Sequence, residues 1–108
     1  MNSAQERAAE LTALLRSSED PLWRRLRSLL EAKGLQPTTV TVADLFRDDT
    51  SLEFGLIVTP DHRVFQFDFD YLHKTVPTGV FSEWRDITAT WQGSPYQQQV
   101  SAALRVAK

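Results

Sequence analysis

Two aspartates and one glutamate are spaced so that they could place three carboxylates on one surface. Asp68 and Asp70 alternate with aromatic residues in the segment VFQFDFDY, and Glu53 precedes them in LEFGLIV. Successive side chains of a strand point to opposite faces, so Asp68 and Asp70 are expected on one face, roughly 7 Å apart. Such carboxylates could attract a basic protein partner or bind a hard divalent cation. The third interpretation is a solvated face balanced by arginines on neighbouring strands.

The pairing of two strands decides whether Glu53 joins the aspartates. We expect a hairpin between Leu52–Val58 and Val64–Tyr71, joined by the turn sequence TPDHR. A register that places Glu53 opposite Asp70 turns every ring of the hairpin toward the core and leaves the acids together on the other face. A slip of one residue would spoil that separation.

The candidate protein interface is therefore the uncovered face of this sheet. Trp84 is placed at its border because Trp84 and Trp91 are seven residues apart, and a regular strand cannot turn both rings to one core. Either one tryptophan is exposed or a bulge intervenes, and an exposed tryptophan would suit a protein interface. The candidate residues are Glu53, Gln66, Asp68, Asp70, Arg85 and Trp84.

Other titratable residues form weaker candidates. His62 and His73 are expected at opposite ends of one strand, too far apart to share a metal. The arginines of WRRLRSLL could contact phosphates, but acids flank them and the leucines indicate a packing helix. No G-x-S-x-G, H-E-x-x-H or phosphate-loop pattern occurs. We therefore expect no metal and no cofactor, and we favour a binding protein over an enzyme.

Helical periodicity precedes and follows the strands. A helix is expected from Ser3, which could form a capping box with Glu6. Asp20-Pro21 predicts the start of a second helix and Ser94-Pro95 that of a last one. The strands are expected at Thr38–Phe46, Leu52–Val58, Val64–Tyr71 and Phe81–Trp91. The predicted fold is α+β: a four-stranded, mainly antiparallel meander with two N-terminal helices and one C-terminal helix packed on one face.

Length and composition narrow the class of protein. The chain has 108 residues, of which 42% are apolar and 24% charged, which is typical of a single globular domain spanning residues 1–108. The absence of cysteine excludes disulfides and thiolate chemistry. The longest apolar run, Phe54–Val58, is far shorter than the ~20 residues of a membrane span, and no signal-peptide pattern occurs. We expect a cytoplasmic chain that has no membrane association, and its arginine-rich composition suggests a bacterial source.

The charge distribution bears on the partner. The net charge is −2, but residues 38–93 carry nine acidic and four basic groups, which would repel a phosphate backbone. Nucleic acid is therefore not the expected partner. We hypothesise a small non-enzymatic module that binds another protein. In size and charge the chain is similar to immunity proteins that neutralise secreted toxins, although no motif carries their residues over.

Two alternatives remain open at this point. One is a small-ligand protein or enzyme with a pocket between helices and sheet, using Asp68, Asp70 or His73. The other is a structural homodimer formed through the open sheet face or through an edge strand.

Overall fold

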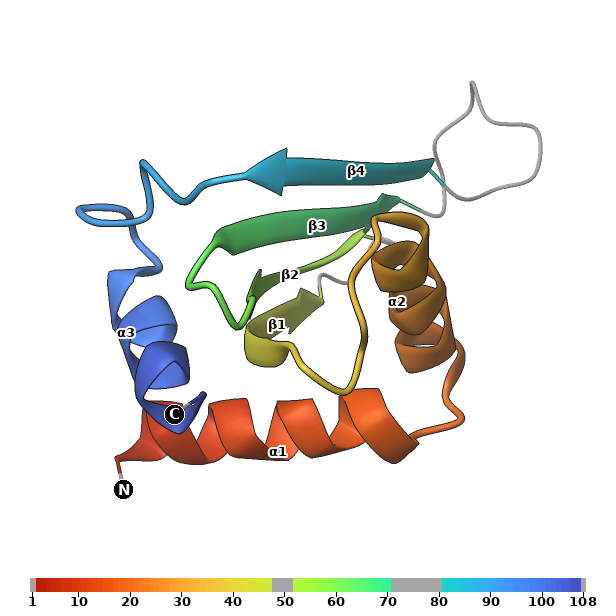
Figure 1. The fold of residues 1–108 in the computed structure, drawn as a ribbon, viewed down its shortest axis with the longest axis horizontal. Coiled ribbons are helices and arrows are strands. Elements are labelled where there is room, and N and C mark those ends of the chain that lie inside the picture. The colour runs from red at the N-terminus through yellow and green to blue at the C-terminus, as the bar shows by residue number, and fades with distance from the viewer. Residues whose placement is uncertain (1, 48–51, 71–80, 108) are drawn as a thin grey trace.

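The computed structural model describes residues 2–47, 52–70 and 81–107, which form three helices and one four-stranded sheet (Figure 1). Each strand pairs antiparallel with the next, in the order β1-β2-β3-β4. The α+β class, the meander and the order of the elements are thus confirmed. The elements are α1 (Ser3–Ser17), α2 (Pro21–Ala32), β1 (Thr41–Arg47), β2 (Leu52–Val58), β3 (Val64–Asp70), β4 (Phe81–Asp86) and α3 (Gln97–Val106).

Short polar motifs set the helix starts. In α1 the Asn2 Oδ1 accepts a hydrogen bond from the Gln5 N–H (2.9 Å), and the Gln5 Oε1 accepts one from the Asn2 N–H (3.0 Å). The capping box predicted at Ser3 and Glu6 is therefore wrong by one residue, because amide side chains can make the same reciprocal bonds. The start of α2 is as predicted, with Asp20 as its cap.

The fourth strand is shorter than predicted and the last helix starts later. β4 ends at Asp86, whose carboxylate accepts a hydrogen bond from the Thr88 N–H (2.9 Å) and turns the chain away from the sheet. Turns follow, and α3 begins at Gln97 instead of directly after Pro95. The residues between β4 and α3 therefore cross the end of the sheet as a connecting loop.

The register of β2 and β3 differs from the prediction by one residue. Glu53 lies opposite Phe69, and Asp70 lies opposite Leu52. The predicted pairing of Glu53 with Asp70 is wrong. Each residue of β2 is therefore paired with the β3 residue that precedes its predicted partner. The residues that we expected to pair consequently lie on opposite faces of the sheet.

The turn between β2 and β3 explains this register. The Thr59 N–H donates to the Arg63 carbonyl (2.9 Å). The loop of the hairpin is therefore limited to the residues between Thr59 and Arg63. His62 adopts a positive φ of 65°, a conformation that tightens the turn. The Thr59 hydroxyl also accepts a bond from the Arg63 N–H (3.1 Å), so side-chain and backbone bonds hold the same closing pair.

Helices cover both faces of the sheet, which differs from the single covered face that we expected. The α2 face packs against α2 and part of α1, and its buried strand residues are Val42, Ile57, Phe67 and Phe69. The α3 face packs against α3 and the start of α1, and its buried strand residues are Ala43, Leu56, Val58 and Val64. This two-sided burial explains why three successive residues at the end of β2, Leu56–Val58, are all apolar and buried.

Helix α1 closes the β1 edge of the sheet, along which it runs in Figure 1. The buried Thr12 hydroxyl accepts a hydrogen bond from the Val42 N–H (2.9 Å). The pairing with β2 shifts between Val42 and Asp44, which marks a bulge in the strand. Arg7 contacts the Asp44 carboxylate (3.3 Å) and the Leu45 carbonyl (3.3 Å). Groups that an edge strand would leave open are thus bonded by a helix.

Candidate functional site

The residues predicted as one interface are divided between the two faces of the sheet. Gln66 and Asp68 lie on the α3 face, where Arg85 is opposite Gln66. Glu53 and Trp84 lie on the α2 face, because they are paired with Phe69 and Phe67 respectively. The side chain of Asp70 lies outside the described residues. Glu53 and Asp68 therefore cannot contribute to one acidic surface, and the predicted shared face is wrong.

Asp68 is used inside the molecule. It is buried, with 9% of its surface exposed, and its Oδ2 accepts a hydrogen bond of 2.8 Å from the Arg85 Nη2. Its Oδ1 accepts a longer bond of 3.3 Å from the Gln66 Nε2. The bond to Asp68 raises the pKa of Arg85 above its ordinary value, and the nearby Glu83 acts in the same direction. Arg85 therefore neutralises a carboxylate that burial would otherwise penalise.

Glu53, the other described acid of the predicted interface, is also paired with an arginine. The Glu53 Oε2 lies 2.6 Å from the Arg47 Nε, across the β1–β2 pair. Each described acid of the candidate set is thus balanced by an arginine on the adjacent strand, as in the third interpretation above. Within the described ranges, no group of three or more histidine, aspartate or glutamate side chains is arranged to hold a metal ion.

Both tryptophans in question are partly buried, on opposite faces. Trp84 stacks on Phe65 with ring centroids 4.8 Å apart and packs against the core of the α2 face. Trp91, in the loop after β4, packs against the core of the α3 face. Their odd spacing needs no fully exposed ring and no bulge, because Trp91 lies beyond the end of β4, where strand alternation no longer applies, and each face of the sheet has its own core.

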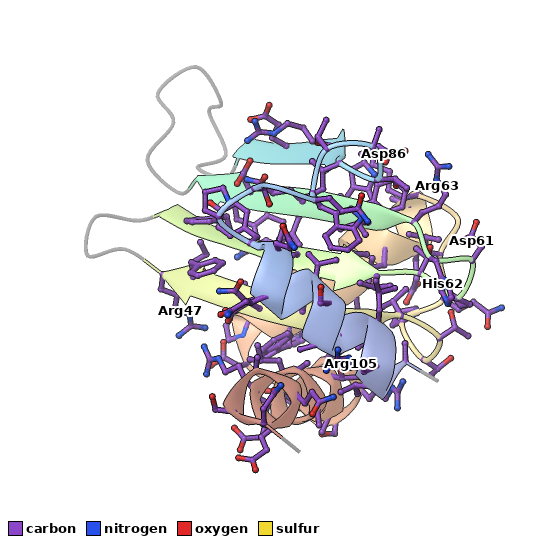
Figure 2. The ribbon with its side chains drawn as sticks, turned by 90° about the vertical axis from the view of Figure 1, so that its left-hand side faces the viewer. Arg47, Asp61, His62, Arg63, Asp86 and Arg105 are labelled. Carbon is purple, nitrogen blue, oxygen red and sulfur yellow. The ribbon has the colours of Figure 1, made fainter. Side chains whose placement is uncertain are left out.

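A polar cluster lies at the β2–β3 turn, where Figure 2 shows Asp61, His62, Arg63 and Asp86 at one end of the sheet. Asp86 accepts bonds from the Thr88 hydroxyl (2.6 Å) and N–H and is paired with Arg63. These contacts, the Thr88 hydroxyl first, lower the pKa of Asp86 to about 2. The Thr59 hydroxyl likewise lowers the pKa of Asp61. His62 is exposed in the turn, and His73 lies outside the described residues.

Two depressions lined by described residues lie beside the helices. One, of about 420 Å³, lies between α1, the start of α2 and the end of β1, with Leu14 and Trp23 among its lining residues. Another, of about 370 Å³, lies between the N-terminal turn of α1 and α3. Neither includes a residue predicted from the sequence as part of a site. Within the described ranges, no helix has the length and hydropathy that a bilayer span requires.

The sequence indicated an edge strand only as an unspecified surface of a homodimer, whereas the structure describes the outer edge of β4 in detail. The Ile87 N–H donates to the Val64 carbonyl (2.8 Å), so the odd-numbered residues of β4 direct their backbone groups toward β3. Ser82, Trp84 and Asp86 must therefore direct their N–H and C=O groups away from the sheet. Within the described ranges, no strand or helix pairs with this edge, which is at the top of Figure 1.

Side chains of both faces flank this edge. Trp84 stands on the α2 face, whereas Glu83 and Arg85 stand on the α3 face with side chains 47% and 52% exposed. Two of the residues predicted from the sequence, Trp84 and Arg85, are thus together at the edge although they belong to different faces. The signal that could have found the edge is positional: β4 is the last strand of a meander.

Comparison with protein-family models gives no match, and comparisons with curated proteins and with solved structures give none either. The geometry of the chain is therefore the basis for a functional proposal.

Proposed function

We propose that this chain is a protein-binding module that adds an extended segment of a partner polypeptide to the outer edge of β4. The observation that carries the proposal is the contrast between the two edges of the sheet. The β1 edge is bulged and bonded to α1 through Thr12 and Arg7. The β4 edge is a regular run of six residues that is unpaired within the described part of the chain. An unpaired edge is a ready template for a further strand.

The side chains beside the edge would supply specificity. A strand added next to β4 would bond to the main chain of Ser82, Trp84 and Asp86 and would place alternate side chains on the two faces. On the α2 face these side chains would contact Trp84, an aromatic residue of the type that anchors interfaces. On the α3 face they would contact Glu83 and Arg85. This favours a segment that places a basic side chain beside Glu83 and an acidic side chain beside Arg85.

A proline at an outward-facing position tests this proposal. In Ser82→Pro the lost N–H is one that points away from β3, so the β3–β4 ladder keeps its bonds. Extended peptides selected from a random display library on the wild-type chain should lose binding to Ser82→Pro by at least about tenfold, because the new ring also blocks close approach. Ser82→Ala, which retains the N–H, is the matched control and should bind as the wild type does.

Two results would refute the proposal. One is a selection that yields no peptide binding at β4, judged by protection of the Trp84 amide hydrogen from exchange. The other is equal binding of the selected peptides to wild type and Ser82→Pro, with circular dichroism showing that both are folded.

The resemblance to immunity proteins in size and charge adds a proposed partner class, a secreted toxin. A gene for such a toxin next to the gene for this chain would supply the protein to test. Wild type should then inhibit the purified toxin, and Ser82→Pro should not. Inhibition by both variants would place the contact elsewhere on the molecule.

A further inference from the structure

We infer that the strand which pairs with β4 is the β4 of a second copy of this chain, antiparallel, with Trp84 on the two-fold axis. This inference rests on the proposed function, since it names the occupant of the same edge, and the second copy takes the place there of the secreted toxin considered above. The product would be one continuous sheet running through both copies. The argument has three steps, which concern symmetry, hydrogen bonding and charge.

Symmetry limits the registers. Two antiparallel copies of one strand are related by a two-fold axis perpendicular to the sheet, which leaves each face on its own side. Residues that meet across the axis must therefore both be even-numbered or both be odd-numbered in β4. Axes centred on Glu83, Trp84 or Arg85 satisfy this condition near the middle of the strand.

Hydrogen bonding agrees with an axis at Trp84. The outward backbone groups of β4 are those of Ser82, Trp84 and Asp86, as shown by the bond between Ile87 and Val64. With the axis at Trp84, the two Trp84 residues exchange both of their bonds, and Ser82 of each copy does so with Asp86 of the other. Every outward group of the strand then has a partner.

Charge selects this register over its neighbours. With the axis at Trp84, Glu83 lies opposite Arg85 of the second copy, and Arg85 lies opposite Glu83 of the second copy. These are the non-hydrogen-bonded pairs, in which side chains approach most closely. An axis at Glu83 would place the two Glu83 side chains against each other, and an axis at Arg85 would do the same with the two arginines. Opposite charges stabilise a cross-strand pair and like charges destabilise it.

The state of these side chains in the single chain fits the pairing. Glu83 and Arg85 are about half exposed, so both can reach a second copy. Arg85 directs Nη2 to Asp68, while its Nε lies 3.6 Å from Glu83 of its own strand, a long contact that a better-placed carboxylate could replace. On the opposite face, the second Trp84 would cover the half-buried Trp84 beside Phe65.

Sedimentation equilibrium of the full chain tests the inference with Glu83→Lys. Wild type should dimerise, and Glu83→Lys should weaken the dimer at least about tenfold, because two attractive pairs become two repulsive ones. Glu10→Lys makes the same charge change at an exposed position of α1, which runs along the opposite, β1 edge of the sheet, and should leave the dimer unchanged. The register is read from a nuclear Overhauser contact between the Hα of Glu83 and the Hα of Arg85 in a sample of mixed isotope labelling.

The outcomes separate this inference from the proposed function. A monomeric wild type, or a dimer indifferent to both Glu83→Lys and Ser82→Pro, overturns the inference. If such a monomer still binds selected peptides at β4, the proposed function stands and the occupant is another protein. A dimer that Glu83→Lys weakens and that protects the Trp84 amide supports both.

Discussion

Arg85 of β4 donates a 2.8 Å hydrogen bond to the carboxylate of Asp68 on β3. The arginine is half exposed, but the aspartate is buried, so the two partners depend on the bond to different degrees. A hydrated guanidinium can lose its partner at little cost. A buried carboxylate that loses its cation keeps its desolvation penalty without compensation.

This asymmetry predicts unequal effects of removing either partner. Arg85→Ala should lower the free energy of unfolding by about 1–3 kcal/mol, because Asp68 then keeps a buried charge whose remaining hydrogen bond within the described ranges is the one from Gln66. Asp68→Asn should cost less, because the amide is neutral. Urea unfolding measures both, with Glu10→Gln at an exposed position of α1 as the control. Equal losses for the two variants would contradict the asymmetry.

Phe67 is the ring on which the α2 face depends most directly. It is fully buried and lies against Phe69, with ring centroids 5.4 Å apart. Phe67→Ala should destabilise the chain by about 3–5 kcal/mol, because it leaves a cavity between the sheet and α2. Leu14→Ala, at a helix position 42% exposed, should change stability by less than about 0.5 kcal/mol. Thermal unfolding of both variants measures the two losses of stability. A loss for Leu14→Ala as large as that for Phe67→Ala would contradict the prediction.

Gly55 is needed where β1, β2 and β3 come close together. A Cβ on this residue would lie 2.6 Å from the Phe67 ring and 2.7 Å from the Asp44 carbonyl oxygen. The carbonyl belongs to the backbone of β1 and cannot move without disturbing the sheet. Gly55→Ala should therefore cost about 1–3 kcal/mol of stability, measured by urea unfolding. A stability equal to that of wild type would show that the strands can separate at no cost.

The buried bond between α1 and the β1 edge gives a further prediction. Thr12→Val keeps the shape of the side chain but leaves the Val42 N–H without its acceptor, and should cost about 1–3 kcal/mol. Thr12→Ser retains the hydroxyl and should lose less. Hydrogen exchange of the Val42 amide measures the bond directly, and unchanged protection in Thr12→Val would refute its role.

The lowered pKa of Asp86 predicts a pH dependence with a definite sign. The folded pKa of about 2 lies below the ordinary value of 3.8, so the charged contacts contribute stability above about pH 4. That contribution is lost as the pH falls from about 4 to about 2. Thr88→Val should raise the pKa of Asp86 toward its ordinary value, since the Thr88 hydroxyl is the largest cause of the shift.

Carboxyl carbon shifts in a nuclear magnetic resonance titration measure this pKa directly. Thr88→Ser keeps the hydroxyl and should keep the low pKa, whereas Thr88→Val and Arg63→Gln should each raise it. A larger effect of Arg63→Gln would mean that the ion pair, and not the hydroxyl, controls the titration.

The interface predicted from the sequence and the proposed β4 edge have two residues in common. Trp84 and Arg85 were placed near a protein-binding surface, and they flank the β4 edge of the present proposal. Grouping Glu53 with Asp68 is wrong because the register of β2 and β3 differs by one residue from the predicted one, which puts the two acids on opposite faces. The arginines that balance the acids lie on adjacent strands, as one interpretation of the sequence expected, but the strand pairing decides which arginine meets which acid.

The sequence by itself determined the order of the helices and strands and the α+β class, because these follow from local periodicity, caps and turn residues. It also marked Phe67 and Phe69 as core residues. Only the tertiary structure decided the register of β2 and β3, and with it the face on which each acid lies and the arginine that it pairs with. The physical reason is that β2 is apolar on both sides, so alternation favours neither register, and the bonds that close the turn from Thr59 to Arg63 set the pairing instead.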